Sequence, residues 1–144
     1  MQLISPAFGQ NDRLPQKYSC DGAGINPPLE FKDVPTGTQS ITLIMDDPDA
    51  PLGTFDHWIA FNIPPVAAGI AEGQTQPGTM GRNTTGKSNY APPCPPRDQH
   101  HYVFKLYALD VKLNLQPGAV KKDIERAMQG HILAQAELIG LYSR

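Results

Sequence analysis

Short apolar runs separated by segments rich in proline make up the first three quarters of the chain. Residues 40–45 alternate between apolar and polar side chains, so that Ile41, Leu43 and Met45 fall on one face of a predicted strand. Residues 57–63 form a second run that predicts a strand. This period of two residues is typical of a sheet with one buried face.

The run 101–109 is apolar on both faces except for Lys105. Such a pattern predicts a central strand that is covered on both sides. Proline lacks the N–H group that a sheet ladder needs, so the prolines between the runs predict turns, strand ends and edges.

A different pattern follows the last proline, Pro117. Apolar residues recur there at helical spacing, at Val120, Ile124, Ala127 and Met128. Gly130 suits the position just after a helix, so the pattern predicts a helix near Lys121–Gln129. Residues 131–142 are compatible with either helix or strand. Together the elements predict an all-β fold of two antiparallel sheets, a sandwich or a barrel, with one short helix near the C-terminus.

The length of 144 residues predicts a single domain, residues 1–144. Hydrophobic residues are 40% and charged residues 18% of the chain, which is a globular balance and disfavours disorder. The net charge of -2 argues against a protein that binds nucleic acid mainly by neutralising phosphates.

Targeting signals and cysteines give information about the cellular compartment of the protein. No run approaches the roughly 18 apolar residues that span a bilayer, so stable membrane insertion is not expected. The first residues lack the pattern of a secretory signal, which favours the cytoplasm. The two cysteines, Cys20 and Cys94, form no disulfide framework, and in a reducing compartment we expect both thiols to stay free.

An acidic segment ends one predicted strand, and His57 begins the next. Its carboxylates are Asp46, Asp47 and Asp49. They could simply cap turns by accepting hydrogen bonds from nearby N–H groups. Alternatively, a carboxylate that accepts from a histidine ring fixes its tautomer, raises its pKa and frees the other ring nitrogen for an anion.

A second cluster begins the run 100–109. His100 and Tyr102 are two residues apart on a predicted strand and therefore share a face. The pair could be a core tyrosine beside a strand-end histidine. Two histidine-bearing loops stiffened by proline instead favour a shared pocket with donors suited to a phosphate or carboxylate.

Catalytic alternatives remain at this point. Cys94 with a histidine and an aspartate could form a thiol nucleophile, and the His57/Asp47 pair could activate water in a small hydrolase or lyase. A zinc site drawn from Cys20, Cys94, His57 and His100 lacks the usual ligand spacing, so no metal is expected.

The two clusters together resemble the phosphatidylethanolamine-binding protein family, whose members are also called Raf kinase inhibitor-like proteins. The resemblance rests on Asp47-Pro48-Asp49-Ala50-Pro51, His57-Trp58, Cys94-Pro95-Pro96 and His100-His101-Tyr102-Val103-Phe104. Flanking segments agree, including Cys20-Asp21-Gly22, Asn26-Pro27-Pro28, Gly81-Arg82-Asn83 and the C-terminal residues 130–142. The length is most similar to the bacterial and archaeal branch.

The resemblance implies two antiparallel sheets with Greek-key connections and a cavity for phosphate-type anions or phospholipid head groups. The ligand-binding residues it implies are Asp47, Asp49, Phe55, His57, Pro95, Pro96, His100 and Tyr102. The loop Arg97-Asp98-Gln99 is shorter than is usual in the family, and Arg97 would add a cation beside the cavity.

The resulting prediction is a non-enzymatic binding protein that needs no cofactor. The resemblance implies that it regulates a kinase or another enzyme, such as a protease, by binding. It also implies a homodimer, which the small net charge of -2 would hardly oppose.

Overall fold

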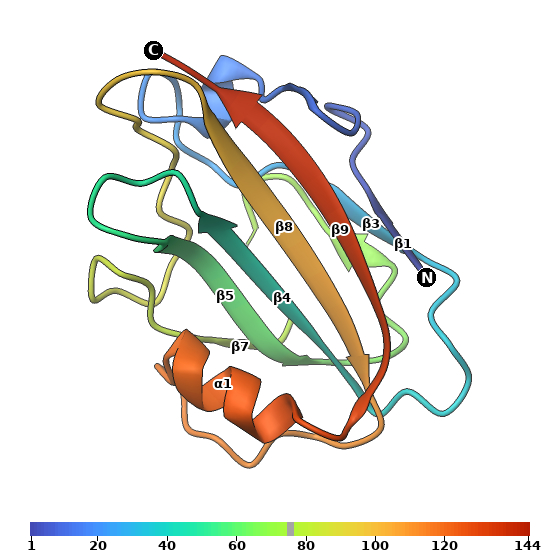
Figure 1. Cartoon of the computed structure of the whole chain (residues 1–144). Coiled ribbons are helices and arrows are strands. Elements are labelled where there is room, and N and C mark those ends of the chain that lie inside the picture. The colour runs from blue at the N-terminus through green and yellow to red at the C-terminus, as the bar shows by residue number, and fades with distance from the viewer. Residues whose placement is uncertain (75–76) are drawn as a thin grey trace.

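The structure is a computed structural model that describes residues 1–74 and 77–144. Its larger sheet has six strands in the order β2-β9-β8-β4-β5-β7. These strands are β2 (Asp12–Arg13), β4 (Ser40–Asp47), β5 (Phe55–Ile63), β7 (Thr79–Met80), β8 (His100–Leu109) and β9 (Ile132–Tyr142). The smaller sheet has the order β1-β3-β6, with β1 (Gln2–Ile4), β3 (Leu29–Lys32) and β6 (Gly69–Ile70). The all-β prediction with two sheets is confirmed, and Figure 1 shows the arrangement.

Strand pairing is antiparallel except between β2 and β9, which run parallel. A short 3-10 helix, η1 (Gln16–Tyr18), follows β2. Within the described ranges the chain forms one α-helix, α1 (Lys121–Met128), which ends one residue before the predicted boundary. The ambiguous residues 131–142 become β9 because nearly their whole length pairs with β8.

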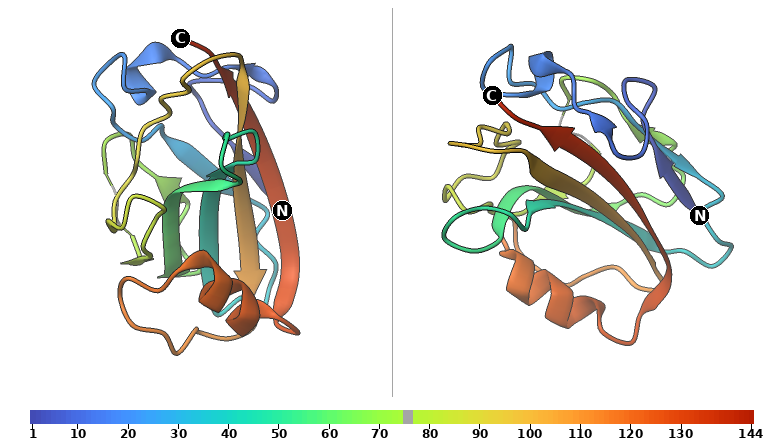
Figure 2. Two further views of the ribbon diagram at one scale, coloured as in Figure 1. Left: turned by 60° about the vertical axis from the view of Figure 1, so that its left-hand side comes forward. Right: turned by 45° about the horizontal axis from the view of Figure 1, so that its top comes forward.

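Apolar residues cover both faces of the central strands. Ile41, Leu43 and Met45 of β4 face the smaller sheet, as their alternation predicted. Ile44 lies on the opposite face and packs with Ile124 of α1. Figure 2 shows α1 against one end of the large sheet, and the site described below lies at the other end. None of the helices in the described ranges has the length and hydropathy that crossing a membrane requires.

The expectation of free thiols is wrong for this structure. Cys20 and Cys94 form a disulfide with their Cα atoms 5.4 Å apart. The two residues are separated by 74 positions in sequence, so only the folded topology brings them together. The sequence argument concerned the redox compartment and contained no information about this distance.

Candidate functional site

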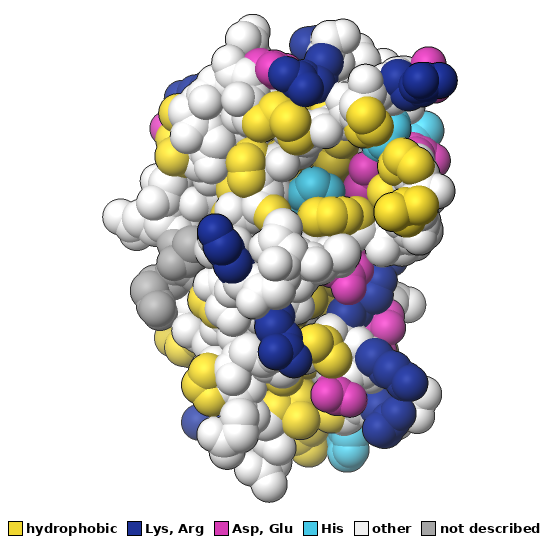
Figure 3. All heavy atoms as spheres, turned by 90° about the vertical axis from the view of Figure 1, so that its left-hand side faces the viewer, with side chains coloured by type: hydrophobic (Ala, Val, Ile, Leu, Met, Phe, Trp, Pro, Cys, Tyr) yellow, Lys and Arg dark blue, Asp and Glu magenta, His cyan; other side chains and the backbone are white. Residues whose placement is uncertain are grey.

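A cavity of about 430 Å³ opens at the end of the large sheet where the loop after β4 meets the loop before β8. Its lining includes the predicted Asp47, Phe55, His57, Pro95, Pro96, His100 and Tyr102. Figure 3 shows a histidine in this hollow with hydrophobic side chains around it. The fold therefore brings together seven of the eight predicted binding residues.

His57 lies on β5 and is only 5% exposed. Its Nδ1 is 2.7 Å from the backbone oxygen of Ala91, so this nitrogen carries the proton and donates it. Nε2 has no partner among the described residues. Burial lowers the pKa of His57 below its ordinary value, although the Ala91 carbonyl and nearby carboxylates oppose that change. The neutral ring is therefore favoured when the cavity is empty.

Asp47, at the end of β4, supports His100 rather than His57. Its Oδ2 accepts a hydrogen bond from Nδ1 of His100 at 2.7 Å, and Oδ1 accepts from the N–H of Asp49 at 2.8 Å. The expected support of His57 by the acidic segment is thus wrong. Asp47 pairs with Phe55 of β5 on one side, and its carboxylate turns to the other neighbouring strand, β8.

Tyr102 completes the polar part of the cavity. Its ring lies edge-on to His57 at 5.3 Å and stacks on His100 at 6.4 Å between centroids. Burial, and then the charge of Asp47, raise the pKa of its hydroxyl. The hydroxyl has no hydrogen-bond partner in the described part of the chain. It therefore keeps its proton and can donate to an anion.

Three further side chains shape an apolar wall. The Phe55 ring lies 4.6 Å from the His57 ring, between centroids, and Pro95 and Pro96 line the cavity beside them. An aromatic ring and two prolines offer no charge and little freedom of movement. The wall thus limits water around the two histidines.

Two sequence predictions fall outside the cavity lining. Asp49 binds His101, accepting from its backbone N–H at 2.8 Å and its Nδ1 at 2.7 Å. Arg97 is exposed in the loop before β8 and does not line the cavity. Asp49 therefore stabilises the loop, and Arg97 does not add a cation to the wall.

The lining also includes residues that the sequence analysis did not assign to ligand binding, namely Cys20, Ala50, Pro51, Thr85, Ala91, Pro92 and Cys94. The backbone N–H of Thr85 donates to Oδ1 of Asn83, a buried residue that also donates to the His57 carbonyl. Asn83 belongs to the flanking motif Gly81-Arg82-Asn83, which was the available signal. The backbone carbonyl of Ala91 gave no signal because any residue provides one.

The neighbouring Asp46 faces the other side of the sheet. It is 1% exposed and accepts from Lys105 of β8 at 3.1 Å and Lys121 of α1 at 3.2 Å. Alternation along β4 therefore divides the acidic segment, with Asp46 holding the helix and Asp47 serving the cavity.

The described residues contain no group of three or more side chains placed to hold a metal ion. The proposed thiol nucleophile is wrong for this structure because the sulfur of Cys94 is bonded to that of Cys20.

Comparisons with known proteins agree on one family. The family model described as phosphatidylethanolamine-binding protein matches residues 4–143. A UPF0098 protein of Pyrococcus horikoshii is 50% identical over 98% of this chain and 76% of its own length. Another UPF0098 protein, from Methanothermobacter thermautotrophicus, is 47% identical over 100% of this chain and 99% of its own.

Two solved structures extend the likeness to three dimensions. A phosphatidylethanolamine-binding protein homologue of Chlamydia trachomatis superposes with a TM-score of 0.97 at 47% identity, covering 99% of this chain and 97% of that one. Escherichia coli YbcL, described as a member of the mammalian family, has a TM-score of 0.91 at 27% identity, with coverages of 99% and 98%.

Proposed function

Since the chain belongs to the phosphatidylethanolamine-binding protein family, we propose that its cavity binds a phosphate-type anion and that the protein works by binding. The convergence of His57, His100 and Tyr102 on one hollow carries this proposal. Each of the two histidine rings uses its Nδ1 for a hydrogen bond within the protein, which leaves its Nε2 for a ligand. The Tyr102 hydroxyl supplies a further donor.

The carboxylate of Asp47 is compatible with an anionic ligand. Both of its oxygens already accept hydrogen bonds, from His100 and from the Asp49 N–H. These bonds offset its charge and hold the His100 ring in one orientation. A phosphate oxygen can then accept from a protonated Nε2, or a phosphate hydroxyl can donate to a neutral one. Phosphoryl groups suit this arrangement because they carry both oxygens that accept and hydroxyls that donate a hydrogen bond.

A hydrolase or lyase is the rival class. Asp47 hydrogen-bonds His100 and not His57, so the expected His57/Asp47 pair is not formed. Cys94 is held in the disulfide and cannot act as a nucleophile. The His100–Asp47 pair is the feature that favours catalysis, since a carboxylate can orient a general base toward water. Release of nitrophenol from a nitrophenyl phosphate measures this rival directly.

Calorimetry with inorganic phosphate tests the binding proposal. His57→Ala removes the Nε2 atom that would hydrogen-bond a phosphate oxygen or hydroxyl, so affinity should fall about ten- to a hundredfold. Asp47→Asn keeps the shape but weakens the support of His100, and it should lower affinity about tenfold despite removing a negative charge.

The matched controls are His131→Ala and Asp110→Asn. They remove the two members of an exposed ion pair with a similar separation, 2.8 Å, and phosphate affinity should not change. Tighter binding by Asp47→Asn would contradict the role given to Asp47. Absence of phosphate binding by the unmodified protein would sink the proposal, and turnover of the nitrophenyl ester would favour the rival.

Regulation of another enzyme belongs to the same proposal. A kinase or a protease would be bound through a phosphate-type group seated in the cavity or through the loops around it. Family membership supports this step. Binding of such an enzyme should be lost in the variants that lose phosphate and kept in the two controls.

A further inference from the structure

The disulfide lies in the wall of the cavity. Cys20 and Cys94 both line it, and both residues are exposed to solvent. Cys94 directly precedes Pro95 and Pro96, which form part of the same wall. An exposed cystine is open to attack by a thiolate. The bridge is therefore both reachable and structurally connected to the proposed site.

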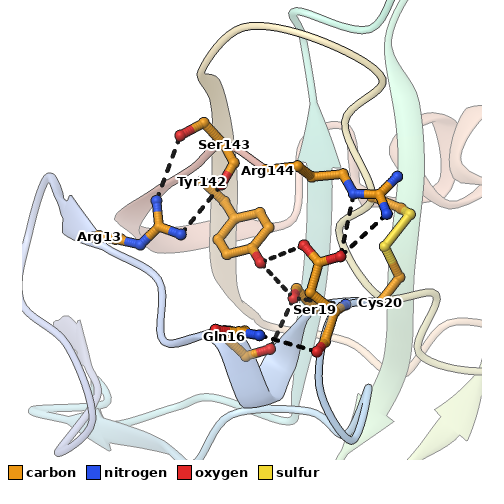
Figure 4. A network of polar contacts seen from close by, with 9 residues as sticks. Arg13, Gln16, Ser19, Cys20, Tyr142, Ser143 and Arg144 are labelled. Carbon is orange, nitrogen blue, oxygen red and sulfur yellow. Dashed lines mark hydrogen bonds and ion pairs between the residues drawn. A yellow bond between two sulfur atoms is a disulfide. The ribbon is translucent and has the colours of Figure 1, made fainter.

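The Cys20 side of the bridge is held by a dense polar network, shown in Figure 4. The Ser19 hydroxyl lies 2.7 Å from the Gln16 carbonyl and 2.8 Å from the Tyr142 hydroxyl. Tyr142 in turn donates to a carboxylate oxygen of Asp21 at 2.6 Å. These contacts anchor Cys20 from both sequence neighbours to β9, with or without the disulfide.

The Cys94 side has no comparable support. The Pro93 carbonyl accepts a hydrogen bond from the Cys20 N–H at 3.0 Å. Farther along the chain, the next residue with a hydrogen bond is His100, which bonds Asp47. Between them, residues 94–99 make no hydrogen bond or ion pair with other residues in the described ranges. The disulfide is thus the cross-link that holds this part of the wall.

We propose that Cys20–Cys94 is a site of reversible thiol–disulfide exchange that controls the anion cavity. The reactant class is a dithiol. Its thiolate attacks one sulfur of the bridge, a mixed disulfide forms, and the other cysteine leaves as a thiolate that takes a proton from water. The second thiol of the reagent then displaces the first cysteine. Two electrons reduce the protein to a dithiol, and the reagent becomes a disulfide.

Reduction acts on the wall and not on the donors. With the cross-link open, residues 94–99 gain freedom that a bound ligand must again remove. This inference rests on the proposed function for its effect on a ligand. We expect phosphate affinity to fall about two- to tenfold on reduction, as ordering costs of this kind imply. By linkage, bound phosphate should favour the disulfide by the same factor.

The experiment compares the oxidised protein, the protein reduced with dithiothreitol, and the Cys20→Ser/Cys94→Ser variant with and without dithiothreitol. Calorimetry with inorganic phosphate gives the affinity. Backbone order parameters of Cys94, Arg97, Asp98 and Gln99 report the wall without any ligand. We expect both the affinity and these order parameters to fall on reduction. The variant should match the reduced protein and ignore dithiothreitol.

The two readouts separate this inference from the proposed function. If the oxidised protein binds no phosphate, the proposed function fails, and the order parameters alone decide whether the bridge holds the wall. Equal order parameters in both redox states would overturn the inference, as would equal phosphate affinity. A far-ultraviolet spectrum that shows general unfolding on reduction would also overturn it, because the proposal requires the rest of the fold to persist.

Discussion

Two buried histidines share one cavity but differ in what holds them. His57 donates to a neutral carbonyl, that of Ala91, whereas His100 donates to the carboxylate of Asp47. A carbonyl fixes the ring without adding a full charge, so burial decides the proton affinity of His57 and lowers its pKa. A bound anion would oppose this effect of burial and raise the pKa of His57 again.

The lowered pKa of His57 makes stability depend on pH. In the unfolded chain this ring takes up a proton near its ordinary pKa of 6.5, whereas the folded ring resists protonation until the pH is lower. The unfolded state thus binds more protons in that window, and the free energy of unfolding falls as the pH decreases below 6.5.

Urea unfolding of the unmodified protein and of His57→Asn measures this effect. Asparagine can still donate to the Ala91 carbonyl but does not titrate. The variant should lose less stability between about pH 7.5 and pH 5, the range in which histidine titrates. Identical pH profiles would show that His57 does not contribute.

At the scale of elements, β4 serves two opposite faces of the large sheet. Asp47 faces the cavity, while Asp46 accepts from Lys105 of β8 and Lys121 of α1. Lys121 also lies 2.9 Å from Asp56 of β5. Lys121 thereby ties the helix to two strands, β4 and β5, without contributing to the cavity, so the helix's contribution to stability can be separated from that of binding.

Removing the charge of Lys121 should destabilise the fold and leave binding intact. Lys121→Met deprives buried Asp46 of one partner, and we expect a loss of about 1–2 kcal/mol, less than for a fully buried pair because the lysine is partly exposed. Lys122→Met is the matched control on the exposed side of the same helix, with an expected change within about 0.5 kcal/mol. Chemical unfolding gives these values, and a changed phosphate affinity in either variant would contradict the separation.

At the scale of the whole molecule, β9 leaves part of its outer edge unpaired. The N–H of Asn11 donates to the Ile139 carbonyl, and the N–H of Leu14 donates to the Leu141 carbonyl. Every second residue of β9 therefore directs its backbone N–H and C=O groups away from β8. By this alternation Gln135 and Glu137 direct theirs the same way, yet their outward groups have no partner in the described part of the chain. Unpaired edges of this kind can pair with another strand.

We expect a second copy of the chain to pair with this edge. In an antiparallel pairing centred on Gln135, Glu137 of one copy faces Leu133 of the other and not its own counterpart, so like charges are kept apart. The homodimer implied by the family resemblance stays a prediction, and this edge is where we expect it. Residues of β1, of the segment after it and of β9 line a hollow of about 610 Å³ beside this edge.

Sedimentation at high micromolar concentration tests the dimer. Leu133→Lys places a charge on the edge and should yield monomers. Val66→Lys is the control, because Val66 is also an exposed hydrophobic residue but lies outside β9. A monomeric unmodified protein, or a Leu133→Lys variant that dimerises as well as the control, would refute this interface.

The sequence by itself determined the central strands β4, β5 and β8, the helix and, through the family resemblance, seven of the residues that line the cavity. Alternation placed Ile41, Leu43 and Met45 on one face because successive side chains of a strand point to opposite sides. The same rule put His100 and Tyr102 together, and the structure stacks them. These features depend on local periodicity, which a linear sequence contains in full.

Only the tertiary structure decided which groups meet across strands and loops. Pairing of β4 with β8 places Asp47 within hydrogen-bond distance of His100. The path of the proline-rich loop places the Ala91 carbonyl beside His57. The disulfide joins residues 74 positions apart. Partners of this kind follow from strand order and loop closure, which depend on the packing of the entire chain and leave no mark in the local pattern of residues.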